Sequence, residues 1–277
     1  MIADLVHDLY HQTGIACSLH LIECGDDGSL SALDLPSQAE ILNPGENLGY
    51  SGGNNLALRA LADQPNPIVI VNPDIRLGSE STISDLVRAL DQHKSFGAIA
   101  PAIHTPDGRI EYTNSKIDWR LGLAIHTGTY LERWPPGTES VVKMPWIDGA
   151  CFIVRPEALA DVGLFDENYF LYSEEVDWCL RAERCGWMVG VSPQLYVNHR
   201  RSASFEGTSK GAYYAYRNSF YLFLKHRGWG IWMVHWCYRL VRFCLADANR
   251  KNGESAAAAL GAWHALLGRW GRMPRDQ

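Results

Sequence analysis

Acidic side chains gather at three points where the pattern of apolar residues predicts that a strand ends or a helix begins. Asp74 closes the Asn-Pro-Asp turn after a run of β-branched residues, Glu23 ends an earlier predicted strand, and Glu174 and Glu175 open a predicted helix. Carboxylates bind hard divalent cations and accept protons from attacking hydroxyls, so these clusters suggest metal-assisted or acid–base chemistry. Two plainer roles stay open, because an Asn-Pro-Asp turn can simply end a strand and glutamates offset the dipole at a helix start.

Strands and helices alternate in the segments that must position these carboxylates. The apolar spacing predicts strands at residues 16–23, 40–42, 67–71, 97–101, 151–155, 187–191 and 195–198, helices at residues 2–12, 55–62, 81–92, 156–162, 173–185, 212–245 and 256–267, and a long loop at residues 112–142. This alternation predicts an α/β fold with a mainly parallel central sheet flanked by helices, followed by a C-terminal helical tail. Ligands bind beyond the carboxyl ends of such strands, which is where Asp74 lies.

Composition and charge exclude several classes of protein. With 277 residues, 47% of them hydrophobic and 20% charged, the chain can bury a large core and is not a disordered protein. Its formal net charge of -6 argues against a protein that coats nucleic acid. Seven cysteines without a C-x-x-C pair suggest neither a disulfide framework nor a thiolate zinc site. No apolar run reaches the roughly 18 to 20 residues of a membrane span and the N-terminus lacks a signal-peptide pattern, so we expect a cytoplasmic protein.

A resemblance to a known family is carried by motifs in a fixed order. They are NLGYSGGNNLALRAL and IVIVNPD in the first half, and WIDGACFIVRPEALADVGLFDENYFLYSEEVDWCLRAERCGW and VNHRRSAS in the second. Over residues 15–225 the chain resembles a family 2 glycosyltransferase, and its second half is similar to the rhamnosyltransferase and galactofuranosyltransferase branch. The resemblance implies a GT-A (nucleotide-diphospho-sugar transferase) domain at residues 1–211 and a C-terminal extension at 212–277. The first strand of the family has no counterpart before the predicted helix at 2–12 and is expected to be missing.

The resemblance assigns a metal site and a donor site. Asn72-Pro73-Asp74 resembles the family's D-x-D motif with only the last Asp retained, which implies that Asp74 binds the Mn²⁺ or Mg²⁺ ion that bridges the donor diphosphate. His199 resembles the late histidine that completes the metal shell, although a lone histidine is otherwise more often structural. The residues assigned to the nucleoside diphosphate sugar are Glu23, Asn47, Gly49, Gly52, Asn54, Asn72 and Asp74. Glycines in this loop would let the backbone approach ribose and phosphate.

The resemblance also assigns the catalytic base and the acceptor side. The stretch Glu174-Glu-Val-Asp177 stands where the family has E-D-x-D, and its second position, here Glu175, supplies the general base. Glu174 is the second candidate, with helix capping as its alternative role, and Asp177 could pair with Arg181. The residues assigned to the acceptor are Trp146, Asp148 and Gly149. The first of them could stack on a sugar face, with a tryptophan of the core or of a lid as the alternative.

These assignments predict an inverting, metal-dependent enzyme that moves a sugar from a nucleoside diphosphate to a hydroxyl of a cell-surface glycan or lipid-linked acceptor. The base takes the proton of the attacking hydroxyl, and the cation neutralises the departing diphosphate. A catalytically inactive GT-A module that binds a glycan or a partner is the main alternative, since the family's first strand is expected to be missing and Glu175 replaces an Asp of the family. A nucleotidyltransferase that makes nucleotide sugars is disfavoured, because no basic glycine-rich loop opens the chain.

The C-terminal part of the chain differs in charge from the rest. From Ser219 onward there are nine Lys and Arg and three Asp and Glu, which gives a local charge of about +6, and aromatic residues are interleaved with the basic ones. Interfacial helices on anionic membranes combine these residue types, which predicts peripheral contact with the inner membrane face. Packing against the core and a homodimer interface are the alternatives.

Overall fold

The computed structural model describes residues 2–25, 30, 33, 35, 39–200, 208–247 and 253–274, and each structural statement concerns these residues. Residues 201–204 of the VNHRRSAS motif lie outside this part of the chain. The elements are α1 (Ile2–Tyr10), β1 (Leu19–Ile22), β2 (Ala39–Leu42), α2 (Gly49–Ala60), β3 (Ile68–Val71), β4 (Ile75–Leu77), α3 (Thr82–Gln92), β5 (Phe96–His104), β6 (Asn114–Asp118), β7 (Leu123–Thr127), β8 (Val142–Met144), β9 (Cys151–Val154), α4 (Pro156–Val162), α5 (Glu174–Arg184), β10 (Met188–His199), α6 (Ser209–Arg227), α7 (Trp232–Asp247) and α8 (Glu254–Leu266).

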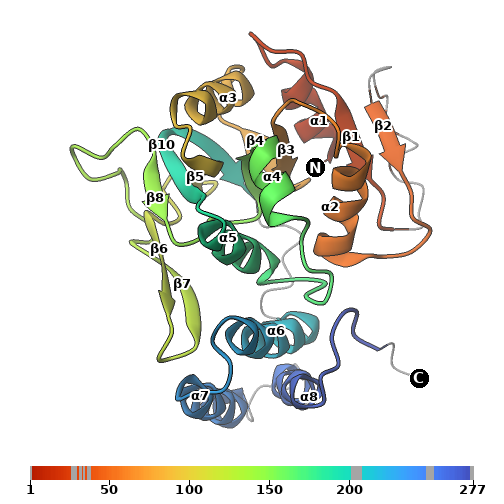
Figure 1. Ribbon diagram of the computed structural model, residues 1–277, viewed down its shortest axis with the longest axis vertical. Helices are drawn as coiled ribbons and strands as arrows, with labels where there is room; N and C mark the ends of the chain where they lie inside the picture. Colours follow the sequence, from red (N-terminus) through yellow and green to blue (C-terminus); the bar gives the residue numbers. More distant parts are fainter. Residues whose placement is uncertain are drawn as a thin grey trace.

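A six-stranded mixed sheet lies at the centre of the molecule (Figure 1). Its strand order is β3-β9-β5-β10-β4, and β8 also pairs with β10. β5 and β10 run parallel, whereas β9 runs antiparallel to β3 and β5, and β4 and β8 run antiparallel to β10. The predicted α/β class is confirmed, but the sheet formed by these described strands is mixed and not mainly parallel. A parallel strand needs a crossover connection, which is usually a helix. The segment between β5 and β9 contains the strands β6–β8 and no helix, and β9 runs antiparallel to β3 and β5.

Both faces of the central sheet are covered. Ala98 and Phe152 face the core that the sheet shares with α4, α5 and α6, whereas Ile99 and Ile153 face Leu90 of α3. Successive residues of a strand point to opposite faces, so a strand that is covered on both sides reads as a continuous apolar run. This explains why β3, β5 and β9 were predictable from sequence.

Two segments differ from the sequence prediction. Residues 112–142, expected as a loop, contain the β6–β7 hairpin and the strand β8, which are too short to give a clear period. The two strands expected at 187–191 and 195–198 form the single strand β10, whose pairing with β5 shifts register between Ser192 and Tyr196. Pro193 lies inside this irregularity, and proline cannot donate to the ladder.

The pairing of strands decides where the chemically interesting residues meet. The end of β3 pairs with the start of β9, and the N–H of Asn72 donates to the carbonyl of Ala150 at 2.8 Å. His199, the last residue of β10, pairs with Ile75 at the start of β4. Three strand ends therefore bring Asp74, the residues before β9, and His199 to one edge of the sheet.

The C-terminal helices pack onto the sheet and onto one another. In Figure 1, α6 lies between α5 and the α7–α8 pair. The cluster that contains Phe152 and Val154 of β9 also contains the buried side chains of Phe220, Phe223, Trp232 and Trp236. α6 and α8 approach closely because Gly261 has no side chain: a Cβ there would lie 2.3 Å from the carbonyl oxygen of Tyr213. Core packing is thus observed for one side of the tail, and the domain boundary at residue 211 stays a prediction. None of the described helices is long and apolar enough to cross a membrane.

Asp177 links α5 to α6 through a buried group of charges. Its fully buried carboxylate contacts Arg181 at 2.9 Å, Lys225 at 2.8 Å and His226 at 2.8 Å. Burial alone would raise the pKa of Asp177, but the hydrogen bond from His226 and the charges of Arg181 and Lys225 outweigh it and lower the pKa to about 2. The stabilisation that follows from this shift is present above the ordinary pKa of an Asp and is lost as the pH falls toward 2. The predicted pair of Asp177 with Arg181 is therefore part of a larger network.

We predict that Asp177→Ala lowers the free energy of unfolding by about 3 kcal/mol, because the buried His226 side chain and the partly exposed Arg181 and Lys225 would lose their partner. Urea unfolding followed by circular dichroism measures the change. Asp91→Ala is the control, since the pair of Asp91 with Lys94 is exposed and such pairs contribute about 0–1 kcal/mol. Similar losses in the two variants would show that the buried network does not hold α6 against α5.

Candidate active site

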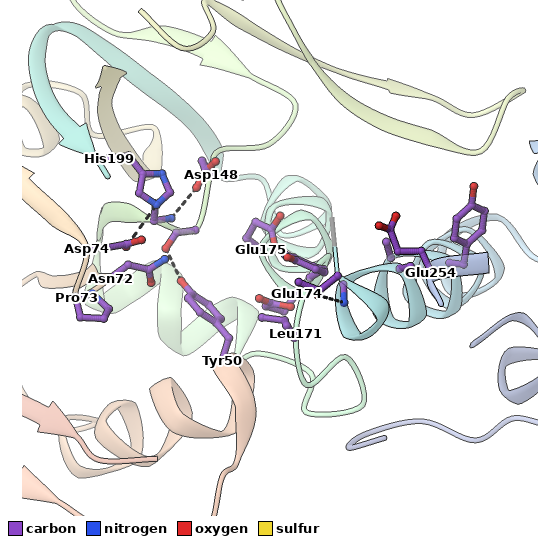
Figure 2. A pocket seen from close by; sticks show the side chains of 18 of the residues that line it. Tyr50, Asn72, Pro73, Asp74, Asp148, Leu171, Glu174, Glu175, His199 and Glu254 are labelled. Carbon is purple, nitrogen blue, oxygen red and sulfur yellow. Dashed lines mark hydrogen bonds and ion pairs between the residues drawn. The ribbon is translucent and has the colours of Figure 1, made fainter. Parts of the chain in front are cut away.

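A cavity of about 620 Å³ lies at the edge where the three strand ends meet (Figure 2). Its lining combines the strand ends, the start of α5 and residues of the C-terminal helices. The predicted site residues that line it are Asn72, Asp74, Asp148, Gly149, Glu174, Glu175 and His199. The structure therefore brings the residues predicted for the metal, the base and part of the acceptor side into one cavity.

Asp74 and His199 face each other in this cavity (Figure 2). Asp74 is buried, and its Oδ1 lies 3.4 Å from Nε2 of His199. The turn at Pro73 ends β3 and places Asp74 opposite the end of β10. Burial alone would lower the pKa of His199, but its interaction with Asp74 outweighs burial and raises the pKa above the usual value. The Asp74 carboxylate therefore favours the protonated form of the His199 ring when no cation lies between them.

The Asp74–His199 pair fits a divalent cation that a further ligand helps to hold. A carboxylate oxygen and an imidazole nitrogen 3.4 Å apart can both reach one ion with bonds of about 2.1 Å. Among the described residues, no group of three or more His, Cys, Asp or Glu is arranged to hold a metal. Two protein ligands suit Mn²⁺ or Mg²⁺ when substrate phosphate oxygens and water complete the shell.

The turn before α5 is strained and is held by α6. Phe170, Tyr172 and Ser173 have φ angles of 64°, 69° and 75°, in the left-handed region that residues other than glycine rarely adopt. Nδ2 of Asn218 on α6 donates to the carbonyl of Leu171 at 2.6 Å and to that of Tyr172 at 2.9 Å. Strained backbone persists only where its surroundings fix it, and it is frequent at functional sites. The tail thereby fixes the turn that presents the two glutamates.

Glu174 and Glu175 both line the cavity at the first turn of α5 (Figure 2). Burial, together with the negative charge of Asp148, raises the pKa of Glu175 to about 7. Burial and the charge of Glu175 raise the pKa of Glu174 well above its ordinary value. A carboxylate that titrates near neutral pH is well matched to a general base at that pH. Glu175 therefore has a pKa suited to a general base, and it is the one whose pKa is also raised by Asp148, a residue predicted for the acceptor side.

We predict that Glu175→Gln raises the melting temperature at pH 8 but not at pH 4.5. The raised pKa means that the folded protein holds a proton on Glu175 between about pH 4.5 and pH 7 that the unfolded chain has released, so stability falls as the pH rises through this window. The amide introduced by Glu175→Gln carries no charge, so the variant avoids the free-energy cost of an ionised carboxylate in the folded protein at pH 8. Thermal unfolding in chelator-containing buffers measures the difference, with Glu183→Gln on the exposed side of α5 as the control. A pH-independent difference would contradict the assigned titration.

Tyr50 lines the cavity beside the glutamates, and the sequence reasoning missed it. Its hydroxyl donates to the carbonyl of Gly149 at 2.6 Å, and burial raises its pKa well above the usual value. A Cβ at Gly149 would lie 3.0 Å from the Tyr50 hydroxyl oxygen and 3.6 Å from Cβ of Glu175. Gly149 thus has a steric role between two cavity residues. The position of Tyr50 inside the NLGYSGG motif was the available signal.

Asp148 and Trp146 have different environments although they are two residues apart. Asp148 accepts a hydrogen bond from the N–H of Ala150 at 2.7 Å, and its Oδ2 lies 3.6 Å from Nε2 of His126. Burial would raise the pKa of Asp148, but the interaction with His126 outweighs it and the pKa is lowered. The Trp146 ring is buried against the His126 ring, with centroids 4.2 Å apart, and does not line the cavity. Trp146 therefore has the core position that the sequence left as the alternative to sugar stacking.

The donor-site residues predicted before residue 60 do not line the cavity. The buried carboxylate of Glu23 accepts hydrogen bonds from the N–H of Leu30 at 3.1 Å and from Asn43 at 3.2 Å. Oδ1 of Asn47 accepts from the N–H of Gly49 at 2.8 Å. These side chains shape the loop that leads into α2, and their contact with a nucleotide stays a prediction.

The glycines of this loop make room for neighbouring parts of the chain. A Cβ at Gly49, where φ is 71°, would lie 2.3 Å from the carbonyl oxygen of Phe170. One at Gly52 would lie 2.9 Å from Cβ of Leu48, and Asn54 donates to the carbonyl of Tyr50 at 2.9 Å. Gly49 therefore allows the start of α2 to pack on the strained turn before α5. This couples the predicted donor loop to the glutamates.

The wall of the cavity formed by the C-terminal helices was not predicted. Its residues are Thr208, Gly211, Ala212, Ala215, Tyr216, Phe243 and Glu254. Small residues at positions 211, 212 and 215 recur at helical spacing between tyrosines, and this was the signal that could have indicated a cavity-facing stripe on α6. The tail is thus part of the site.

Sequence comparison relates the chain to sugar-transferring enzymes. No protein-family model matches it. It is 29% identical over 220 residues to the N-acetylglucosaminyl-diphospho-decaprenol L-rhamnosyltransferase of Mycobacterium tuberculosis, covering 72% of this chain and 71% of that protein. It is 28% identical over 185 residues to the low-salt glycan biosynthesis hexosyltransferase Agl10 of Haloferax volcanii, covering 65% of this chain and 58% of that protein. Its curated homologues include rhamnosyltransferases and hexosyltransferases.

Comparison with solved structures gives the fold. GalNAc-T7 with UDP, GalNAc and Mn²⁺ matches with a TM-score of 0.57 at 14% identity, over 95% of this chain, which spans 54% of that chain's length. Mannosyltransferase PcManGT from Pyrobaculum calidifontis, in complex with GDP-Man and Mn²⁺, matches with a TM-score of 0.55 at 15% identity, over 96% of this chain and 76% of that one. The chain therefore has the GT-A glycosyltransferase fold, and its sequence relatives are glycosyltransferases.

Proposed function

We propose that this protein is an inverting glycosyltransferase that moves a sugar from a nucleoside diphosphate sugar to a hydroxyl of a glycan or glycolipid. The observation that carries the proposal is the meeting, in one cavity, of the Asp74–His199 pair and of Glu175 with its raised pKa. The names of the relatives support this class of reaction, since they are a rhamnosyltransferase acting on a diphospho-decaprenol acceptor and a glycan biosynthesis hexosyltransferase.

In this mechanism the acceptor oxygen forms a bond to the anomeric carbon while the bond from that carbon to the diphosphate breaks. Glu175 takes the proton of the acceptor hydroxyl, and its pKa of about 7 lets it be ionised before the step and protonated after it. Asp74 and His199 would hold Mn²⁺ or Mg²⁺, which supplies positive charge to the departing diphosphate. Attack from the face opposite the diphosphate inverts the configuration at the anomeric carbon.

Asp148 and Gly149 belong to the acceptor side of the proposed site. Asp148 is partly exposed to the cavity and is kept ionised by its hydrogen bond and its contact with His126. An ionised carboxylate can accept hydrogen bonds from sugar hydroxyls. Gly149 lies between Tyr50 and Glu175, and a side chain at this position would be crowded by both.

Calorimetric titration with UDP, dTDP and GDP, with and without Mn²⁺, tests the proposal. We expect one nucleoside diphosphate to bind in a Mn²⁺-dependent manner, and its sugar derivative to be consumed when an acceptor is supplied. Nucleotide binding without turnover by any acceptor would instead favour the inactive module. Release of pyrophosphate from a nucleoside triphosphate and a sugar phosphate would favour a nucleotidyltransferase.

A further inference from the structure

α7 carries two apolar stripes on opposite sides. Trp232 and Trp236 on one side are buried against α6. The opposite side exposes Ile231, just before the helix, and Val234, Tyr238, Val241 and Leu245, each at least 55% exposed. The spacing of 3, 4, 3 and 4 residues places these five side chains in one line along the helix. A surface helix of a soluble protein normally has polar residues on that side.

α8 repeats the pattern beside α7. Its buried side consists of small residues that pack against α6, with Ala258 and Ala262 among them. The residues on its exposed side, or directly after it, are Ala256, Ala259, Leu260, Trp263, Leu266 and Leu267, all of them apolar. The two helices lie next to each other below α6 in Figure 1, and Sγ of Cys244 on α7 contacts the carbonyl of Ser255 on α8. Both helices are thus apolar on the side that faces away from the molecule.

We propose that the outer side of α7 and α8 is a membrane-docking surface that seats the protein on a bilayer containing anionic lipid. The charges around it favour this occupant. The described residues 228–247 and 253–274 contain four arginines and two acidic residues, and one of the acidic residues, Glu254, lines the cavity on the other side. Arg242 is exposed and lies over the Tyr238 ring at 5.8 Å. Aromatic rings beside basic groups are typical of helices that lie in the headgroup region.

A second copy of this chain fits the same surface less well. A twofold interface places the same patch opposite itself, so its basic rim would face another basic rim. Like charges across an interface are unfavourable, whereas anionic headgroups attract basic residues near the membrane surface. The charge pattern therefore favours a lipid surface over a homodimer.

The docking surface would bring a lipid-linked acceptor to the cavity, and this part of the proposal rests on the proposed function. Phe243 of α7 and Glu254 of α8 line the cavity, while the exposed stripe lies on the other side of α7. The cavity is then about one helix diameter, roughly 10 Å, from the docking surface. A saccharide attached through a diphosphate to a membrane lipid spans a distance of that order. Vesicle binding itself involves neither donor nor acceptor, so its failure is distinguishable from failure of the transferase proposal.

Co-sedimentation with vesicles tests the proposal, using phosphatidylcholine alone and phosphatidylcholine mixed with phosphatidylglycerol. The full chain should bind the anionic vesicles more strongly, and higher salt should weaken that binding. Tyr238→Ser/Leu260→Ser should reduce the affinity on the order of tenfold. Arg242→Gln should reduce affinity for anionic vesicles by about fivefold and leave phosphatidylcholine unaffected.

Matched controls make the result specific. Tyr130→Ser/Leu131→Ser removes the same residue types from the loop after β7, where the exposures are 56% and 38%, against 59% for Tyr238 and 38% for Leu260. This control and Arg133→Gln should bind as the unaltered protein does, and circular dichroism should show that all variants are folded. Absence of binding to anionic vesicles at low salt, or equal losses in both double variants, would overturn the proposal. A dimer in sedimentation equilibrium that Tyr238→Ser/Leu260→Ser dissociates, without vesicle binding, would assign the surface to a second copy and overturn it as well.

Discussion

Glu175→Gln is expected to slow sugar transfer by about 10²- to 10⁴-fold while leaving the affinity for the donor nucleotide unchanged. The amide keeps the shape of the side chain but cannot take the proton of the acceptor hydroxyl. Glu175 lines the same cavity as Asp148, the residue proposed for the acceptor side. Initial rates at saturating donor measure the loss, and calorimetric titration measures donor affinity in the same preparation.

Two further variants identify which carboxylate acts as the base. Glu183→Gln changes an exposed residue of the same helix and should transfer at the unaltered rate. Glu174→Gln should be impaired less than Glu175→Gln, since Glu174 is more deeply buried and its neighbours are Glu175 and Asp177. An inactive Glu174→Gln together with an active Glu175→Gln would reverse the assignment.

Asp74→Asn is expected to weaken Mn²⁺-dependent donor binding by about 100-fold or more. Removal of groups that merely support a metal ligand typically costs about 10- to 100-fold in metal affinity, and Asp74 is proposed as a ligand itself. His199→Ala should cost less, about tenfold, because its imidazole is neutral as a ligand and the carboxylate remains. Titration of donor nucleotide at a series of Mn²⁺ concentrations measures both effects.

Asp107→Asn is the control for this prediction. Asp107 is an exposed carboxylate in the turn after β5, where it pairs with Arg109 and does not line the cavity. It should bind the donor nucleotide as the unaltered protein does. If Asp74→Asn retains the same Mn²⁺-dependent affinity as this control, the metal assignment is wrong.

The strand that leads to Asp74 was predictable because consecutive residues in the sequence carry its signal. Residues 68–71 are all β-branched, as expected for a strand that is covered on both faces, and the Asn-Pro-Asp turn ends it. The gathering of Asp74 and His199 was also expected, although the strand directions were wrong. β9 is antiparallel to its neighbours, and its start, instead of a parallel strand end, brings Asp148 to the edge of the sheet.

The contribution of the C-terminal helices was not predictable from local pattern. Tyr216 and Phe243 reach the cavity only because α6 packs beside α5 and because α7 and α8 pack against α6. Such contacts join segments that are far apart in sequence. The hydrogen bonds from Asn218 to the strained turn also join segments that are far apart in sequence, so local pattern does not predict them. Trp146 shows the opposite case, because its indole could suit a sugar or a core, and only tertiary packing against His126 decides between them.

The assignment of Glu175 as base and of the Asp74–His199 pair as metal ligands predicts an inverting transfer. NMR of the glycoside formed from a nucleoside diphosphate sugar, an acceptor alcohol and Mn²⁺ tests this most directly, because the one-bond carbon–proton coupling at the anomeric centre reports its configuration. The account predicts a product of opposite configuration to the donor, formed by the unaltered protein and at least about 100-fold more slowly by Glu175→Gln. Retention of configuration, or equal rates in the two proteins, would contradict it.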